Sequence, residues 1–399
     1  MEYTSITDRL SKLGSEKWAL HLHARELAAK GTQILELTIG EPDIPPDDVL
    51  LEECRRAMFS GRTGYSNGRG EPSVVNALAS KYSSRTARNI SAENVLCFPG
   101  TQTALFATMM ALVETGDSVL VGDPLYATYE GVIRATGAKQ VPVPLYARNQ
   151  FRMQPEDIEA AITPESKVLL LNNPHNPTGA VMSPGDISAI GEVCQKHDLM
   201  IVSDEVYEDL IFDGVFTSPF DNDDLAERTI VVSSISKSYA APGFRSGWAV
   251  GPVEFCNRLL PLSETMLFGG QPFIADMTAY ALTHKSDTAR RLRVAYKRRA
   301  TEVFNALEKT TGARPIMPEA GMFILLDVRD SGMSGDEFAW SLLEAEKVAV
   351  MPGTSFGQQA DGFIRLSLTV PDEVLQDACQ RIARFCSERA SSQMQSVGQ

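Results

Sequence analysis

The chain has few of the residues that build metal centres or disulfide frameworks. Its 399 residues include only five histidines and six cysteines. The cysteines are far apart, no two form a CxxC pair, and no group of His and Cys has the spacing of zinc ligands. We therefore expect no metal site, and we expect the cysteines to be reduced thiols, as is usual in a cytoplasmic protein.

Long apolar runs and positive charge are also scarce. No apolar run is long enough to span a membrane, and the first residues, MEYTSITDRLSKL, lack the apolar core of a signal peptide. The 37 Lys and Arg are outnumbered by 51 Asp and Glu, which gives a net charge of −14. Phosphate contacts need a basic face, so this balance disfavours binding of nucleic acid or of an anionic membrane. We expect a cytoplasmic protein that binds neither.

What the chain does contain is a regular alternation of short apolar runs and helical segments. The apolar and β-branched runs are Val119–Gly122, Lys139–Val143, Val168–Leu171, Met200–Ser203, Thr229–Val232 and Trp248–Gly251. This alternation predicts an α/β fold with a mostly parallel sheet wrapped by helices.

The pattern changes after about residue 285, and a second domain is predicted there. A long charged helix over 287–309 leads to a strand over 321–327, a helix over 335–346, strands over 348–351 and 362–368, and a helix over 371–389. We predict an N-terminal segment, 1–45, that joins this smaller α+β domain. The large domain then covers 46–285 and the small domain 286–399.

Lys237 is the most informative single residue. It follows the apolar run Thr229–Val232, lies among serines, and is followed by Arg245. A surface lysine normally has carboxylates three or four residues away, whereas a lysine among hydroxyls and a second cation suits a phosphate group. Burial beside a cation also lowers the pKa of a lysine, which favours a Schiff base with an aldehyde. The alternative is a surface loop that happens to contain a lysine.

Other polar residues follow the predicted strands, where ligands of parallel sheets bind. Asp204 could keep a pyridine nitrogen protonated, while Tyr207 and Asn176 could donate hydrogen bonds to a phenolate oxygen. Tyr126 could stack on a flat ring. A phosphate could be held by Gly100, Thr101 and Gln102 at a helix start, with Ser234 and Arg245. Together with Lys237, these residues describe a site for pyridoxal 5′-phosphate.

The sequence resembles the class I/II, fold-type I aminotransferases over nearly its whole length. The resemblance rests on six motifs in the family order: Ile39-Gly-Glu-Pro-Asp43, Gly100-Thr101-Gln102, Asn173-Pro-His-Asn-Pro-Thr-Gly179, Asp204-Glu-Val-Tyr207, Ser234-x-x-Lys237 with Arg245, and Ile364-Arg365-Leu-Ser367. It implies the fold of a fold-type I pyridoxal-phosphate transferase. It also implies a ping-pong transfer of the α-amino group of an L-amino acid to a 2-oxo acid such as pyruvate or 2-oxoglutarate.

The resemblance also implies roles for individual residues. Lys237 corresponds to the Schiff-base lysine, which also moves the proton of the substrate, and Asp204 and Tyr207 assist the chemistry. Arg365 corresponds to the arginine that binds the substrate α-carboxylate, with Gly40 and Asn176 beside it. Tyr65 resembles the tyrosine that reaches the phosphate in the neighbouring subunit, which implies a homodimer with shared active sites.

Substrate preference depends on a departure from the aspartate-specific members of the family. Some of those members bind the side-chain carboxylate of the substrate with an arginine from the partner subunit. The corresponding segment here, Met266–Gln271, has neither Arg nor Lys. A dicarboxylate substrate would leave a carboxylate unpaired. Asp123–Glu130 and Met266–Gly269 are most similar to bacterial arginine–pyruvate transaminases. Arginine or another long or neutral amino acid is therefore the expected donor.

Two other functions remain open at this point. A carbon–sulfur β-lyase would use the same lysine and cofactor but expel a β-substituent, and it would need no second keto acid. A regulator with an aminotransferase-like domain would carry an added DNA-binding domain. This chain is acidic, and its match to the family begins by about residue 35, so a regulator is disfavoured.

Overall fold

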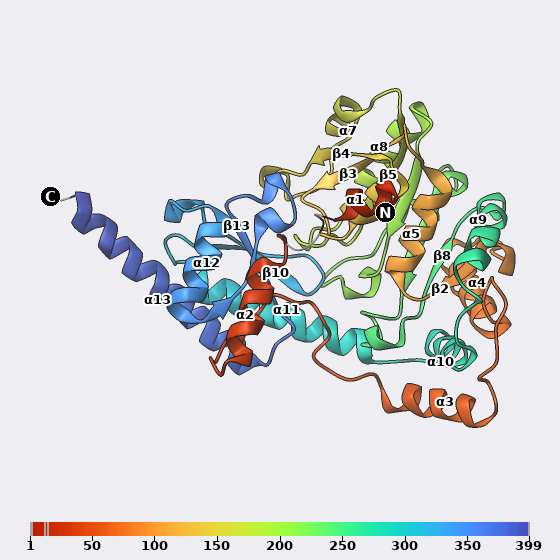
Figure 1. The fold of residues 1–399 in the computed structure, drawn as a ribbon, viewed down its shortest axis with the longest axis horizontal. Coiled ribbons are helices and arrows are strands. Elements are labelled where there is room, and N and C mark those ends of the chain that lie inside the picture. Colours follow the sequence, from red (N-terminus) through yellow and green to blue (C-terminus); the bar gives the residue numbers. More distant parts are fainter. Residues whose placement is uncertain (1–2, 12, 14–15, 398–399) are drawn as a thin grey trace.

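A seven-stranded sheet forms the centre of the molecule (Figure 1). The structure is a computed structural model that describes residues 3–11, 13 and 16–397. The strand order is β2-β8-β7-β6-β5-β3-β4. The bounds are β2 Val95–Phe98, β3 Ser118–Asp123, β4 Lys139–Pro144, β5 Ser166–Asn172, β6 Met200–Asp204, β7 Thr229–Ser234 and β8 Gly247–Val250. Each predicted apolar run lies within or overlaps one of these strands.

Both faces of this sheet are buried, as is typical of parallel sheets covered by helices. Successive side chains of a strand point to opposite faces, so Val119 and Val121 pack with one core cluster and Leu120 with another. One face is covered by α5 (Thr101–Leu112), α6 (Tyr129–Thr136) and α9 (Val253–Met266). The other face is covered by α7 (Pro155–Ala161), α8 (Pro184–Lys196), α3 (Asp48–Phe59), α4 (Pro72–Thr86) and α10 (Pro272–Thr283).

The sheet is mostly parallel, with one exception that matters for the site. The pairs β3–β4, β3–β5, β5–β6 and β6–β7 are parallel, whereas β8 runs antiparallel to both β7 and β2. The start of β8 therefore lies at the same edge of the sheet as the carboxyl ends of its neighbours.

A second, antiparallel sheet lies in the C-terminal part of the chain. Its order is β12-β13-β10-β9, with bounds β9 Arg314–Ile316, β10 Phe323–Asp327, β12 Met351–Pro352 and β13 Phe363–Ser367. It packs with α11 (Thr288–Leu307), α12 (Gly335–Glu346) and α13 (Asp372–Val397). These helices agree with the predicted α+β pattern, but β9 was not predicted.

The predicted strand over 348–351 is wrong as a single element. Val348–Ala349 forms β11, which pairs in parallel with β1 (Leu35–Glu36), while Met351–Pro352 pairs with β13 in the four-stranded sheet. The chain therefore changes sheets at Val350. The pairing also brings the N-terminal segment into the small-domain core, where Leu20 and Ala24 of α2 (Ala19–Ala29) and Leu37 are buried.

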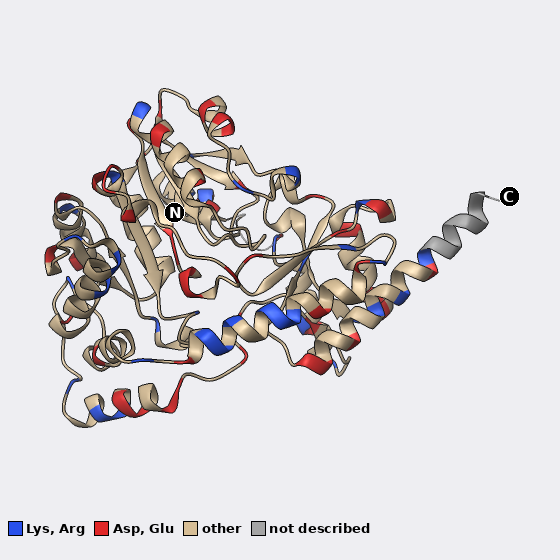
Figure 2. Cartoon of the chain, turned by 180° about the vertical axis from the view of Figure 1, so that it is seen from behind, with Lys and Arg blue, Asp and Glu red and all other residues tan. Residues whose placement is uncertain are grey.

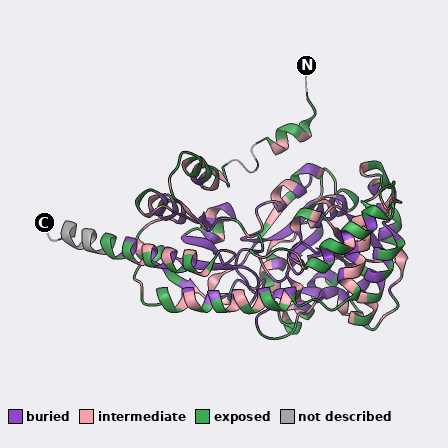
Figure 3. Ribbon diagram, turned by 90° about the horizontal axis from the view of Figure 1, so that it is seen from below, coloured by how far each residue is buried: buried purple, intermediate pink, exposed green. Residues whose placement is uncertain are grey.

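The domain boundaries at residues 45 and 285 stay predictions. Residues 1–2, 12 and 14–15 of the predicted N-terminal segment, and 398–399 of the predicted small domain, lie outside the described residues. Buried residues gather in the strands and on the inner sides of the helices (Figure 3).

Charged residues of both signs are spread over the surface (Figure 2). The basic side of α11 is largely neutralised, since Arg290, Arg291, Lys297 and Arg298 all form ion pairs with acidic residues. None of the helices in the described part of the chain combines the length and the apolar character needed to cross a membrane. The same residues contain no group of three His, Cys, Asp or Glu that could hold a metal ion.

Candidate active site

A cavity of about 300 Å³ lies where the carboxyl ends of the central strands meet the small domain. It is bounded by residues at or shortly after the ends of β2, β3, β5, β6 and β7, and by residues from the N- and C-terminal parts of the chain. The lining residues are Trp18, Ile39, Gly40, Thr101, Gln102, Leu105, Tyr126, Tyr129, Asn172, Asn176, Asp204, Val206, Tyr207, Ser234, Ser236, Lys237, Pro242, Arg245, Phe323 and Arg365.

Lys237 lies inside this cavity, and its ammonium group donates a hydrogen bond of 2.7 Å to the carbonyl oxygen of Gly40. Burial is the largest cause that lowers the pKa of Lys237 to about 8; the carboxylate of Glu41 opposes this shift, and the cations Arg365 and Arg245 add to it. A substantial fraction of the amine is therefore neutral near physiological pH. A neutral amine can act as a nucleophile or a base.

Asp204, the last residue of β6, is fully enclosed. Its Oδ2 accepts a hydrogen bond of 2.7 Å from the hydroxyl of Tyr129, and its Oδ1 accepts one of 3.2 Å from the backbone N–H of Val206. Burial raises the pKa of Asp204 to about 6 despite these bonds. A cationic partner at this position would stabilise the ionised form of the carboxylate.

Arg365, on β13, is the buried cation on the small-domain side of the cavity. Its Nη1 donates to Oδ1 of Asn176 at 3.0 Å, and its Nη2 donates to the carbonyl oxygen of Thr38 at 2.6 Å. The guanidinium lies 3.8 Å from the centre of the Phe323 ring. Burial lowers the pKa of Arg365 to about 9, which still leaves it charged at neutral pH.

Asn176 also connects Arg365 to Tyr207. The side-chain amide of Asn176 donates to the hydroxyl of Tyr207 at 3.4 Å, while its oxygen accepts from Arg365. The backbone N–H of Asn176 is itself held by Oδ1 of Asn172 at 2.8 Å. These contacts fix a tyrosine hydroxyl and an amide side by side at one edge of the cavity.

The far end of the cavity is built from the start of α5 and the loops around β8. Because β8 is antiparallel, Arg245 precedes it at the same edge as Thr101. Gly100, with φ +83°, lets Arg245 approach closely, since a Cβ there would lie 2.1 Å from Nη2 of Arg245. A Cβ on Gly247 would lie 2.5 Å from the backbone of Gly100. Side chains at either position would block this arrangement.

The polar groups at this end suit a bound phosphate. The hydroxyl of Thr101 is buried and has no hydrogen-bond partner among the described residues. It lies in the first turn of α5, whose N–H groups and dipole favour an anion. Arg245 is anchored by the carbonyl oxygens of Pro242 and Pro99, at 2.9 and 3.3 Å, and Ser234 and Ser236 line the same cavity. An unpaired buried hydroxyl, a fixed arginine and two serines fit the phosphate of pyridoxal phosphate.

The structure brings together all the predicted site residues except Gly100 and Tyr65. Gly100 lies behind Arg245 and does not line the cavity. Tyr65 is 90 % exposed, and its ring packs at 5.7 Å from that of Phe268, which is 81 % exposed. Neither aromatic residue lines the cavity of its own chain.

Several lining residues were not predicted, among them Tyr129, Asn172, Trp18 and Phe323. Tyr129 follows Tyr126 by three residues and is the first residue of α6, so its sequence position alone does not mark it as a site residue. Trp18 and Phe323 come from distant parts of the chain, and neither belongs to one of the motifs. Only the fold brings them to the cavity.

The chain is similar to known proteins over nearly its whole length. The family model described as aminotransferase class I and II matches residues 32–382. The chain is 38% identical to an arginine–pyruvate transaminase of Pseudomonas aeruginosa over 97% of its own length and 99% of that protein. It is 31% identical to an aspartate aminotransferase of Musicola paradisiaca over 98% of this chain and 99% of that one. A double mutant of Thermus thermophilus aspartate aminotransferase superposes with a TM-score of 0.89 at 32% identity, covering 96% of this chain and 100% of the other.

Proposed function

We propose roles in catalysis and binding for individual side chains of this chain, which belongs to the class I and II aminotransferase family. The protein is an aminotransferase that depends on pyridoxal 5′-phosphate and transfers the α-amino group of an amino acid to a 2-oxo acid. When bound, the cofactor supplies a conjugated ring that accepts the electron pair left behind as the α-proton departs.

Lys237 is proposed as the residue that holds the cofactor and carries the proton. Its lowered pKa supports both roles, because the neutral amine is needed to bond to an aldehyde and to take a proton from the substrate α-carbon. Asp204 holds the proton on the ring nitrogen. Tyr207 and Asn176 orient the ring through its phenolic oxygen, and Tyr126 covers its face.

Arg365 is proposed to bind the α-carboxylate of the substrate. The guanidinium is held in one orientation by Asn176 and Thr38, and its Nε is buried without a partner among the described residues. A carboxylate could accept from such a fork in a bidentate pair. Thr101, Gln102, Ser234 and Arg245 hold the phosphate, with the first turn of α5. Gly100 gives Arg245 room, and Gly40 borders the substrate.

The expected assembly is a homodimer with shared active sites. Tyr65 and Phe268 are exposed aromatic side chains that pack on each other, and Gly269, with φ +75°, fits closely against Ser66 and Asn67. Such a pair of exposed rings on fixed loops suits an interface. In the proposed dimer Tyr65 reaches the phosphate of the partner's site.

The large domain, 46–285, then carries the cofactor, while 286–399 and the N-terminal segment 1–45 carry Arg365 and close the substrate side. A cytoplasmic location is also part of the proposal, supported by the six cysteines, which form no disulfide.

The proposed donor is arginine or another long or neutral amino acid, with pyruvate or 2-oxoglutarate as acceptor. This choice rests on the cations that line the cavity. Among the described residues these are Lys237, Arg245 and Arg365. Each already has a role. No cation is left for a second carboxylate, and Met266–Gln271 offers none. The similarity to a protein named arginine–pyruvate transaminase supports the same choice.

The test is a panel of half-reactions with purified enzyme, in which arginine, methionine, phenylalanine and aspartate each convert the cofactor from its aldehyde to its amine form. We expect kcat/KM for arginine to exceed that for aspartate by about tenfold or more, equivalent to about 1.4 kcal/mol. A tenfold preference for aspartate would contradict the proposed donor. Product formation beyond one equivalent per active site without any added 2-oxo acid would instead indicate lyase chemistry, because a transaminase stops once its cofactor is in the amine form.

A further inference from the structure

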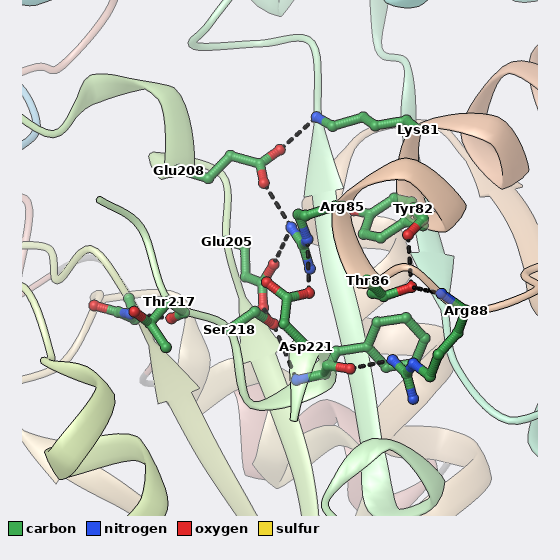
Figure 4. A network of polar contacts seen from close by, with 12 residues as sticks. Lys81, Tyr82, Arg85, Thr86, Arg88, Glu205, Glu208, Thr217, Ser218 and Asp221 are labelled. Carbon is green, nitrogen blue, oxygen red and sulfur yellow. Dashed lines mark hydrogen bonds and ion pairs between the residues drawn. The ribbon is translucent and has the colours of Figure 1, made fainter. Parts of the chain in front are cut away.

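A network of charged side chains joins α4 to the turn that follows β6 (Figure 4). Arg85 is at its centre. Its Nη1 donates to Glu205 at 3.0 Å and to Glu208 at 2.8 Å, and its Nε donates to Asp221 at 2.8 Å. Lys81, one turn earlier on α4, donates to the other oxygen of Glu208 at 2.5 Å.

The two glutamates alternate with two residues of the candidate site. Asp204 and Tyr207 line the cavity, whereas Glu205 and Glu208, each one position further on, point toward Arg85. The turn therefore has two sides. One presents the carboxylate and the phenol to the cofactor cavity, and the other is held by the cations of α4.

Backbone contacts connect these two sides. The N–H of Val206, which lies between the glutamates, donates to Oδ1 of Asp204 at 3.2 Å. The N–H of Glu208 donates to the carbonyl oxygen of Glu205 at 2.9 Å. A shift of either glutamate would therefore move the N–H that orients the Asp204 carboxylate, and would also move the backbone that carries Tyr207.

Glu205 and Arg85 make further contacts with Ser218 and Tyr82. The hydroxyl of Ser218 donates a short hydrogen bond to Oε1 of Glu205, and the side chain of Glu205 has no exposed surface. Arg85 lies 4.7 Å from the centre of the Tyr82 ring. Buried charges carry a large desolvation cost, and they fix a unique geometry only when every partner is present. Loss of one cation would leave buried carboxylates facing each other.

We propose that Arg85, together with Lys81, is a positioning residue that holds Asp204 and Tyr207 in register with the cofactor ring by gripping Glu205 and Glu208. This inference rests on the roles proposed above for Asp204 and Tyr207. Neither Arg85 nor Lys81 lines the cavity, so both act through the turn.

The test compares two variants that remove charges of opposite sign, Arg85→Met and Glu208→Gln, with Arg88→Met as the matched control. Arg88 donates to the carbonyl oxygen of Phe220 and pairs with Asp223, but forms no bond to either glutamate of the turn. Three quantities are measured on holoenzyme: kcat and KM of the half-reaction with the amino donor, visible circular dichroism of the bound cofactor, and Tm. The dichroism reports how firmly the ring is held, independently of turnover.

We expect both Arg85→Met and Glu208→Gln to lower kcat about tenfold, while KM for the donor changes less than about threefold because Arg365 is untouched. Both should lose about half of the visible dichroism relative to wild type, and Arg88→Met should keep it. If Arg85→Met does not fold, Lys81→Met replaces it with the same expectations.

Two results would overturn the proposal. Opposite changes of kcat in the two variants would indicate a long-range field and not positioning, since the removed charges differ in sign. A fall in Tm with unchanged kcat and dichroism would indicate that the network only anchors α4. Failure of the wild-type protein to bind pyridoxal phosphate would instead refute the proposed function, before any variant is compared.

Discussion

The hydroxyl of Tyr129 donates a 2.7 Å hydrogen bond to the carboxylate of Asp204. Tyr129 is the first residue of α6 and is 1 % exposed, so the bond is made in the interior, where water does not compete. A hydrogen bond to an ionised group in such surroundings stabilises the charged form. The relationship makes Tyr129 a partner of the residue proposed to face the ring nitrogen.

Replacing Tyr129 with Phe should therefore weaken catalysis without changing substrate binding. The Asp204 carboxylate would lose one of its two hydrogen bonds, at a cost of about 1.5–3 kcal/mol for a bond to a charged group. We expect kcat of the half-reaction to fall by about tenfold or more, with KM for the donor nearly unchanged. Tyr146→Phe is the matched control, because Tyr146 does not line the cavity. Unchanged kcat in Tyr129→Phe would show that Val206 alone suffices to orient Asp204.

Replacing Asp204 with Asn should stabilise the cofactor-free fold but destabilise the cofactor-bound fold. Burial raises the pKa of this carboxyl from 3.8 to about 6, so ionised Asp204 destabilises the cofactor-free fold. That cost is absent below the ordinary pKa and complete above about 6, where it amounts to about 3 kcal/mol. Cofactor-free Asp204→Asn should thus be more stable than wild type at pH 8, and the difference should vanish below pH 4.

The measurement is denaturant unfolding of both cofactor-free proteins at several pH values. With cofactor bound, the carboxylate has a cationic partner, so we expect wild type to be more stable to unfolding than Asp204→Asn. We also expect the barrier to turnover to be several kcal/mol higher in Asp204→Asn. Equal stability of the two cofactor-free proteins at pH 8 would mean that Asp204 is not strained by burial.

Lys237 should be the residue to which borohydride reduction fixes the cofactor, and attachment should follow its lowered pKa. Only the neutral amine can attack the aldehyde, so the attachment rate should rise about tenfold per pH unit below about 8 and level off above it. Mass spectrometry of the reduced, digested protein identifies the labelled peptide. Lys297→Ala, which removes an exposed lysine, is the control. Label on another lysine, or a rate that still rises above pH 9, would contradict the assignment.

Mixed dimers should reveal whether Tyr65 serves the partner's site. Tyr65→Phe should weaken cofactor affinity by about tenfold through loss of one hydrogen bond to a charged phosphate. A dimer of one Tyr65→Phe subunit and one Lys237→Ala subunit would contain one site with an intact lysine and an intact tyrosine. Subunit exchange should therefore restore high-affinity cofactor binding and activity. No gain over the unmixed Tyr65→Phe enzyme would argue that sites are not shared.

Much of the central sheet was predictable from the sequence because its strands are short apolar runs buried on both faces. Thr229–Ser234 and Met200–Asp204 are examples, and each ends in the polar residues that form the cavity. The antiparallel direction of β8 was not predictable, since an apolar run carries no information about direction. It is nevertheless what brings Arg245 next to Thr101.

The small domain was harder to predict. The run Val348–Met351 is uniformly apolar, and only its partners decide that its halves join different sheets. Strand β9 is three residues long and contains Pro315, so it lacks the usual strand pattern. Tyr129 was missed for a related reason. It begins an amphipathic helix, where a tyrosine normally belongs to the core, and its bond to Asp204 depends on tertiary contacts.

The pairing of β1 with β11 joins Leu35 and Glu36 to residues more than three hundred positions later in the chain. Leu37 donates to the carbonyl oxygen of Ala349 and accepts from the N–H of Ser367, and three residues on is Gly40, which receives the bond from Lys237. During synthesis the N-terminal part of a chain emerges first and folds first where it can. Here the wall that faces Lys237 cannot be set in place until the last strand has left the ribosome. A nascent chain can assemble its central sheet early, but its active site can be completed only after β13 has been synthesised.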